Sequence, residues 1–415
     1  MPSPTPVQDR FPIMARAIPE AAPARGFWVV AAAFALLMAF GTLPTPLWPL
    51  FAERDDFGST VVTIAFATMV AGAAVGFLLF GHLSDRLGRK RVAIPALLTS
   101  VVASLTLVLW TSIAGLLVGR VLTGLAVGLM ASTATVYLSD LYYLAHPDRP
   151  GSSTPGLVAA AANLGGLALG PLAAGVLAQW APYPLITPFV SFGATALVLA
   201  ALVLCSPETI SRTASAVTPA RFALQPGGGR RFAAAAGTGF FSFAVMGFFS
   251  SLGAVVVRDV LHISSPLVAG LAPFTVFAAS AAAQIALRHL TPVRMLVIGV
   301  VLFPTGLALT ATALYHPALW LYLTAAAIAG AGAGLLFKAS VGQAAAAARP
   351  ASRAGVLALF FVVAYLGMGL PSIAFSVVAQ HLGLNPSMIC FAIGLSVGAL
   401  AAVTISARLS ARTSG

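Results

Sequence analysis

Twelve long apolar runs constrain this chain more than any other feature of its sequence. Each is about 20 residues or longer, the length an α-helix needs to cross the hydrocarbon core of a bilayer. Hydrocarbon offers no partners for backbone N–H and C=O groups, so such runs must be helices rather than open sheet. The expected spans are 27–51, 60–80, 92–111, 113–136, 156–180, 185–205, 232–257, 266–287, 295–314, 318–340, 355–379 and 388–407. The sequence therefore predicts an all-α integral membrane protein with twelve transmembrane helices.

Composition agrees with a membrane protein and argues against a nucleic-acid-binding one. Apolar residues make up 59% of the 415-residue chain and charged residues 8%, against about 45–50% and about 25% in soluble domains. The net charge is +12, but the cations fall in the gaps between apolar runs. They form neither the contiguous basic face nor the aromatic-lined groove that binds a polyanion. The expected partners are a lipid bilayer and a small molecule, not nucleic acid.

The cations also predict the orientation in the membrane. With a cytoplasmic N-terminus, the outer loops hold only Arg54 and Arg258, and only Arg120 and Lys338 fall inside expected helices. All other cations then lie on the inner side, as the positive-inside rule demands. Both termini are therefore expected in the cytoplasm. The preference for arginine over lysine and the Ala, Gly and Pro content indicate a GC-rich bacterial genome, and hence a bacterial inner membrane protein.

The chain divides into two similar halves. The expected organisation is a disordered tail 1–25, a six-helix bundle 26–206, a cytoplasmic linker 207–231 rich in Ser, Pro and Gly, a second six-helix bundle 232–408, and a tail 409–415. A weak sequence repeat relates the two halves at an offset of about 200–206 residues, and internal repeats of this kind occur in many transporters. It pairs Gly124 with Gly330, Gly128 with Gly334, Arg149 with Arg353, Gly151 with Gly355 and Pro171 with Pro371. Two pseudosymmetric bundles are predicted.

The loop after the second run carries a dense cluster of charge and reads GHLSDRLGRKR over residues 81–91. It resembles the G-x-x-x-D-[RK]-x-G-[RK]-[RK]-[RK] loop of the major facilitator superfamily at every defined position: Gly81, Asp85, Arg86, Gly88, Arg89, Lys90 and Arg91. The resemblance implies a cytoplasmic latch between the halves, with Asp85 near the start of helix 11 and Arg86 and Arg89 in the same cluster. The alternative is that the cations only enforce topology, which suffices for Lys90 and Arg91 but leaves Asp85 unexplained.

Helix 5 carries a second pattern, in NLGGLALGPLAAGVLAQW. Its small residues and proline, Gly166, Gly170, Pro171, Ala174 and Gly175, resemble the G-x-x-x-G-P-x-x-G-G motif of the antiporter branch of the same superfamily, with alanine in place of one glycine. That resemblance implies export, with this stretch acting as a hinge. Small residues four apart also let helices approach closely in any membrane protein, so a plain packing groove is the alternative.

Helix 4 contains a deep cation. Arg120, preceded by Gly119 and followed by Gly124 and Gly128, resembles the superfamily motif centred on an intramembrane arginine, which is associated with proton coupling and substrate contact. Arg120 lies nine residues past Thr111, about 13 Å into the helix at roughly 1.5 Å per residue. A charge at that depth is costly and usually functional; the alternative is a side chain that snorkels outward.

No acidic residue falls in the centre of an expected helix. Glu53, Asp55 and Asp56 lie at the outer mouth, where they could reach Arg120 or take a proton, although a solvated acidic cap is an equal alternative. Proton coupling is thus implied by the resemblance alone. Near the inner loops, Pro207–Glu208 resembles the P-E-[ST] sequence that follows helix 6 in the family, or is an ordinary helix stop.

The superfamily lines its central cavity with helices 1, 4, 7 and 10. The residues of these helices that we expect in the cavity wall are Phe40, Thr42, Trp48, Arg120, Phe240, Phe241, Phe248 and Phe249. Aromatic residues at helical spacing also serve ordinary core packing or face lipid. A wall of aromatic groups with one cation suits amphipathic or weakly anionic compounds better than sugars, which need several amides and hydroxyls.

Nothing in the sequence indicates an enzyme. Cys205 and Cys390 lie far apart in apolar runs, and the six histidines show no metal-ligand spacing. No cofactor or metal is expected, and no cluster of nucleophile and base indicates a membrane-embedded enzyme or sensor. The predicted function is proton-coupled efflux of a small amphipathic compound by a monomeric secondary transporter. The alternative is a uniporter or importer of a polar or anionic metabolite, with Arg120 binding the anion.

Overall fold

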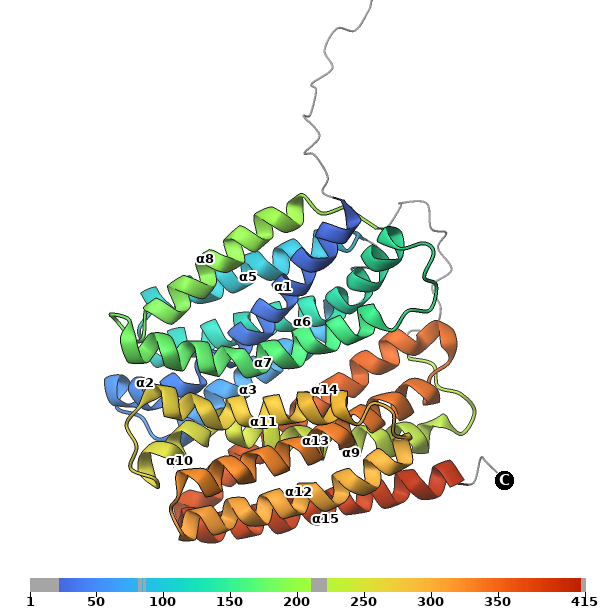
Figure 1. The fold of residues 1–415 in the computed structure, drawn as a ribbon. Helices are drawn as coiled ribbons and strands as arrows, with labels where there is room; N and C mark the ends of the chain where they lie inside the picture. The colour runs from blue at the N-terminus through green and yellow to red at the C-terminus, as the bar shows by residue number, and fades with distance from the viewer. Residues whose placement is uncertain (1–21, 81–83, 85–86, 210–221, 412–415) are drawn as a thin grey trace, which may run out of the picture.

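The chain folds into long helices that lie side by side (Figure 1). The computed structural model describes residues 22–80, 84, 87–209 and 222–411. The helices of the first half are α1 (Pro23–Thr42), η1 (Thr45–Leu47), α2 (Trp48–Asp55), α3 (Ser59–Val75), the π-helical turn η2 (Gly76–Phe80), α5 (Lys90–Leu109), α6 (Ile113–Ala145), α7 (Thr154–Trp180) and α8 (Thr187–Leu204). Those of the second half are α9 (Gly228–Ser251), α10 (Gly253–Asp259), α11 (Pro266–Ala286), α12 (Pro292–Tyr315), α13 (Leu319–Ala347), η3 (Pro350–Ser352), α14 (Arg353–Leu382) and α15 (Leu384–Ala411).

The prediction of an all-α protein with twelve spans is confirmed. Within the described residues, twelve helices are long and apolar enough to cross a membrane. The first of these spans, Pro23–Asp55, combines α1, η1 and α2. The helices extend past some expected ends: α6 continues to Ala145, nine residues beyond 136, and α9 begins at Gly228 rather than 232. At 33 residues, α6 is about 50 Å long by its rise of roughly 1.5 Å per residue, so it projects beyond the hydrocarbon core.

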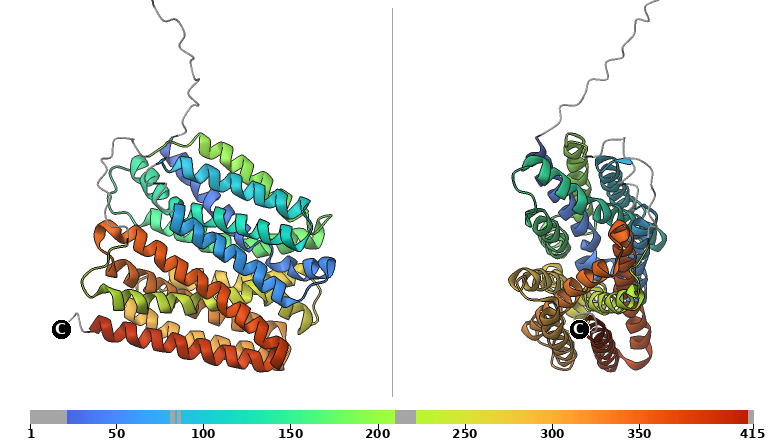
Figure 2. Two further views of the ribbon diagram at one scale, coloured as in Figure 1. Left: turned by 180° about the vertical axis from the view of Figure 1, so that it is seen from behind. Right: turned by 90° about the vertical axis from the view of Figure 1, so that its right-hand side faces the viewer.

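The helices form two layers that follow the order of the chain. Figure 1 shows α1–α8 in one layer and α9–α15 in the other, and Figure 2 shows the same division from behind. The most extensive contacts between the halves join α7 to α11 and α3 to α14. In span order, the fifth contacts the eighth and the second contacts the eleventh. The fifth and the eleventh occupy equivalent places in the two halves, as do the second and the eighth, so the two contacts are equivalent. The layers are therefore related by a pseudo-two-fold arrangement.

Glycine packing supports the same relation. A Cβ on Gly124 of α6 would meet the backbone carbonyl oxygen of Met69 in α3, and a Cβ on Gly330 of α13 would meet that of Val276 in α11. Only glycine lets the two backbones approach so closely. The fourth span thus packs on the second as the tenth packs on the eighth, at the positions that the sequence offset paired.

Two spans are broken near the same end of the molecule. The first span bends between α1 and α2, where Pro44 and Pro46 each lack a backbone N–H. The seventh span breaks at Leu252, between α9 and α10. The short helices α2 and α10 contact one another. We call this end the Arg258 end, after a residue of α10, and the opposite end, where α5 begins, the Arg89 end.

Candidate transport site

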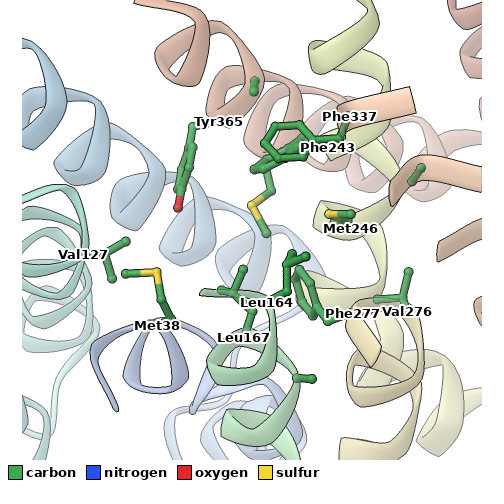
Figure 3. Close-up of a cluster of buried hydrophobic side chains, with 14 of the residues drawn as sticks. Met38, Val127, Leu164, Leu167, Phe243, Met246, Val276, Phe277, Phe337 and Tyr365 are labelled. Atoms are coloured by element: carbon green, nitrogen blue, oxygen red, sulfur yellow. The ribbon is translucent and has the colours of Figure 1, made fainter. Parts of the chain in front are cut away.

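The centre of the molecule is a small apolar cavity between the halves. Gly41, Thr42, Met69, Val127 and Leu167 line it from the first half, and Phe243, Tyr365 and Met368 from the second. Figure 3 shows Tyr365 with its hydroxyl directed toward the first half, and Phe243 beside it. The cavity measures about 10 Å³, roughly room for one water molecule. The centre is therefore closed around an aromatic and thioether lining, which adapts readily to ligands of different shape.

Arg120 lies directly behind this cavity. Its side chain is 1% exposed. Its Nη1 donates to the Gly41 carbonyl oxygen at 3.1 Å, and its Nη2 lies 3.0 Å from the Met69 sulfur. The Nε has no hydrogen-bond partner, and no carboxylate among the described residues pairs with the guanidinium. Gly41 and Met69 also line the cavity, so Arg120 contacts two residues of its lining.

The guanidinium also contacts an aromatic ring. The Arg120 Cζ lies 5.6 Å from the ring centroid of Trp48, within the range of a cation–π interaction. Trp48 is fully buried, and its indole N–H donates to the Ser250 carbonyl oxygen in α9 at 3.3 Å. Arg120 is thus held inside the bundle by a carbonyl, a sulfur and a ring rather than by an acid, and it does not snorkel outward.

The other nominated wall residues lie away from the central cavity, except Thr42. The Thr42 hydroxyl donates to the Leu167 carbonyl oxygen at 2.9 Å and lines the cavity. Phe40 is buried in a core cluster of the first half with Trp48 and Phe51. The four nominated phenylalanines of α9 pack within the second half: Phe240 against Phe241, Phe241 against Gly398, Phe248 against Phe375 and Phe391, and Phe249 against Tyr322.

The acids of α2 do not contact Arg120. Glu53 pairs with Arg258 across the halves, with 2.8 Å between Oε1 and Nη2. Asp55 accepts two hydrogen bonds from its neighbour Arg54, at 2.8 and 2.7 Å. Asp56 ends α2 in the left-handed conformation, with φ of 50°. These three residues therefore belong to the Arg258 end and not to the central cavity.

A larger recess lies between the halves at this end. It has a volume of about 830 Å³, and Glu53, Asp56, Arg258, Phe375 and Gln380 are among its lining residues. Polar contacts cross the interface beside it. They join Thr60 to Ser376, Thr60 to Gln380, Arg258 to the Pro49 carbonyl oxygen and Ser265 to Gln179. The halves are thus tied to one another at the Arg258 end.

The described residues of the charged loop 81–91 form a polar network with α6 and with the segment after α8. Gly81, Asp85 and Arg86 lie outside the described residues, so the expected contact of Asp85 with helix 11 stays a prediction. Gly88 has a φ of 112°, which favours glycine. Arg89 donates to Asp140 from Nε at 3.3 Å and to Ser84 from Nη1 at 2.9 Å.

Glu208 joins this network in a role that the sequence left undecided. Its carboxylate accepts the backbone N–H of Arg89 at 2.8 Å and of Lys90 at 3.2 Å. These N–H groups lie at the start of α5, where a negative charge is favoured by the helix dipole. A Cβ on Gly88 would collide with the same carboxylate. The acid of the P-E-T sequence therefore caps a helix more than a hundred residues earlier in the chain.

The small residues of helix 5 serve two different contacts. A Cβ on Gly166 would meet the Ala35 carbonyl oxygen, and one on Gly170 the Ala39 carbonyl oxygen, both in α1. Gly175 lies against Pro266 at the start of α11, and the Pro171 carbonyl lies against Gly270 in the same helix. The first part of the motif thus packs inside its own half, and the second part packs across the interface.

Sequence reasoning did not find the second-half lining of the cavity. Phe243, Tyr365 and Met368 come from α9 and α14, and each lies within a long apolar run with nothing to mark it. It also missed the bond from Trp48 to Ser250. The hydroxyl of Tyr365 is a polar group within a long apolar span, and it was the only feature of these three residues that could have indicated a role in the cavity lining.

A sequence model described as Major Facilitator Superfamily matches residues 29–372. The glucose transporter GlcP of Staphylococcus epidermidis is 39% identical over 93 residues, 22% of this chain and 21% of that protein. In Escherichia coli, the arabinose-proton symporter is 34% identical over 93 residues, 22% of this chain and 20% of that protein. The multidrug resistance protein MdtL, also of Escherichia coli, is 36% identical over 92 residues, 22% of this chain and 24% of that protein.

These curated matches span only a fifth to a quarter of the relatives' length. The structural likeness is broader. A solved structure of the nucleoside transporter NupG has a TM-score of 0.71 and 12% sequence identity, with 92% of this chain and 99% of that chain covered. At that identity the likeness concerns the fold alone. Because the family match runs from the first span into the eleventh and the fold agrees with it, the chain belongs to the Major Facilitator Superfamily.

Proposed function

We propose that this protein is a secondary transporter that exports a small amphipathic compound in exchange for protons. The observation that carries the proposal is the closed centre between the halves, lined by Phe243, Met368 and Tyr365 with the guanidinium of Arg120 behind it. Such a lining favours a partly apolar compound over a sugar, which needs several amide and hydroxyl partners. Membership of the superfamily supports transport, and the helix 5 pattern and the likeness to MdtL support export.

In this proposal the halves rock against one another around the central cavity. The pairs α7–α11 and α3–α14 form the surface on which they move. The side of the Arg258 end is the outer side, as the positive-inside rule predicts. Opening that side requires the contacts of Arg258 with Glu53 and with the Pro49 carbonyl oxygen to break.

We assign the proton site to Glu53. Protonation removes the charge that pairs with Arg258 and so weakens the closure of the Arg258 end. The other titratable groups nearby are Asp259, which lies 3.8 Å from Arg258, and Asp56 and His262, which line the same recess. The pair of Arg54 with Asp55 is self-contained. Glu53 is thus the acid of α2 whose charge state is coupled to a contact between the halves.

Transport by purified protein in liposomes tests the proposal. Three compounds represent the substrate classes: ethidium as an amphipathic cation, salicylate as an amphipathic weak acid and arabinose as a sugar. We expect ethidium or salicylate to move against its gradient faster than in protein-free liposomes, and only when a pH gradient is imposed, and we expect Glu53→Gln to remove that dependence. Asp148→Asn, an exposed acid at the far end, is the matched control. Flux that ignores the pH gradient would refute proton exchange.

A second candidate function is uptake or facilitated passage of an anionic metabolite. The observation that favours it is the Arg120 guanidinium, which has an unpartnered Nε and no described carboxylate beside it. In that case salicylate enters without a pH gradient, and Arg120→Lys weakens its passage more than that of ethidium. The bidentate geometry of arginine explains the difference, since lysine binds a carboxylate as a point charge.

A further inference from the structure

The short helix α2 is held between Arg120 on one side and the seventh span on the other. Trp48 is its first residue and is fully buried. One face of the Trp48 ring receives the Arg120 guanidinium, with 5.6 Å from Cζ to the ring centroid. The indole N–H of the same ring donates to Ser250 in the opposite half. A single side chain therefore touches both the buried charge and the partner bundle.

The first turn of α2 is attached on both sides of the break in the seventh span. Trp48 binds the Ser250 carbonyl oxygen in α9, before the break at Leu252. The next residue, Pro49, accepts a hydrogen bond at 2.8 Å from Arg258 in α10, after the break. Two adjacent residues of α2 thus fasten both pieces of the broken span, and α2 cannot leave one piece without straining its contact with the other.

Arg120 also bridges the break in its own half. Its Nη1 binds the Gly41 carbonyl oxygen near the end of α1, while its Cζ lies over Trp48 at the start of α2. The guanidinium therefore holds the angle between the two pieces of the first span. Its contact with Trp48 depends on the position of the charge over the ring face, so a shift of the guanidinium changes the restraint on α2.

We propose that Trp48 is the positioning residue that transmits the state of Arg120 to the closure of the Arg258 end. When the guanidinium turns toward a ligand in the central cavity, Trp48 loses its cation–π contact. The bond to Ser250 then weakens, and α2 separates from α10. Coupling of this kind requires contacts that differ between two states, and the bond from Trp48 to Ser250 differs because it crosses the interface. The inference deepens the proposed function, because it rests on alternating access.

The environment of Trp48 sets it apart from the other tryptophans. Trp28, Trp110, Trp180 and Trp320 are 50–71% exposed, as expected for aromatic side chains near the surfaces of a membrane. Trp48 is 0% exposed. A buried indole N–H usually needs a hydrogen-bond acceptor. Here the acceptor belongs to the other half, so the bond must break when the halves separate at this end.

Distance measurements between spin labels test the inference. Labels at Thr111→Cys and His316→Cys, both exposed at the Arg258 end of opposite halves, are placed in the full chain with Cys205→Ala and Cys390→Ala. We expect Trp48→Phe to raise the population of long distances on the order of two- to tenfold, the effect of losing one buried hydrogen bond. Trp320→Phe, which changes an exposed ring, leaves the distribution unchanged. Equal distributions in the two variants would overturn the inference.

Fluorescence of a protein that retains only Trp48 gives a second readout. With phenylalanine at the four other tryptophan positions, the emission is expected to be blue-shifted and quenched weakly by acrylamide. Arg120→Met should increase the quenching constant severalfold, because the ring is no longer held. Lys338→Met, which removes a half-buried cation of α13 that donates to the Gln284 carbonyl oxygen, is the matched control and should leave quenching unchanged. No increase with Arg120→Met refutes the relay.

The two readouts separate this inference from the proposed function. If flux ignores the pH gradient while Arg120→Met still exposes Trp48 and Trp48→Phe still shifts the distances, proton exchange is wrong and the relay stands. If flux follows the gradient but neither variant changes its readout, the relay is wrong and proton exchange stands. Neither measurement needs the natural substrate.

Discussion

Gly165 and Gly166 are neighbours in α7 but face different surroundings. A Cβ on Gly165 would meet nothing within 4 Å, whereas one on Gly166 would collide with the Ala35 carbonyl oxygen and the Met38 side chain in α1. The collision involves backbone, which cannot move aside as a flexible side chain can. At the residue scale, close approach of α7 to α1 therefore depends on one of the two glycines.

Alanine at these two positions gives opposite expected results. Gly166→Ala should lower the free energy of unfolding by about 1–3 kcal/mol, the range for overpacking a close contact. Gly165→Ala should leave it unchanged or slightly raised, because alanine favours the helix more than glycine does. Thermal unfolding of the purified protein in detergent measures both. Equal midpoints for the two variants would contradict the packing argument.

At the scale of a single helix, the start of α5 depends on a distant acid. Glu208, half-buried after α8, accepts hydrogen bonds from the backbone of Arg89 and Lys90. Helix starts have unsatisfied N–H groups, and a carboxylate satisfies two of them here while complementing the dipole. The end of the sixth span and the start of the third are thus joined through one side chain.

Neutralising Glu208 should loosen this junction. Glu208→Gln keeps the size of the side chain and an accepting oxygen but loses the charge. We therefore expect a loss of about 1–2 kcal/mol of stability, which is part of the roughly 1.5–3 kcal/mol of a hydrogen bond to a charged group. Asp148→Asn removes a charge from an exposed pair with Arg149 and should change little, because surface pairs contribute little. The thermal unfolding midpoints of the two variants, measured under the same conditions, test this prediction. A larger drop in the midpoint for Asp148→Asn than for Glu208→Gln would contradict the capping role.

At the scale of the whole molecule, the distribution of arginine predicts which end faces the cytoplasm. The Arg258 end carries few cations and is expected outside. In a background with Cys205→Ala and Cys390→Ala, a membrane-impermeant maleimide should label Thr111→Cys on intact cells. It should label Asp148→Cys, which is exposed near the opposite end, only after permeabilisation. The reverse pattern of labelling would contradict the predicted orientation.

Much of the fold could be predicted because a bilayer allows a spanning segment few kinds of secondary structure. Apolar runs of sufficient length must be helices, and their number is counted directly along the chain. The repeated glycines also predicted equivalent positions correctly, since Gly124 and Gly330 make equivalent contacts in the two halves. Of the residues nominated for the cavity wall, Thr42 lines the central cavity and Arg120 lies behind it. Phe240, Phe241 and Phe248 pack elsewhere, because α9 is buried on several sides and its period does not show which side meets the other half.

The sequence by itself determined the number of helices, their membrane setting, the duplicated plan and the buried charge of the fourth span. Each of these follows from local composition or spacing, which act over one helix or one repeat. The tertiary structure alone decided what Arg120 touches, which half supplies the acceptor for Trp48, and which acid caps α5. Those contacts join residues 51 to 202 positions apart, and their geometry depends on how whole helices cross.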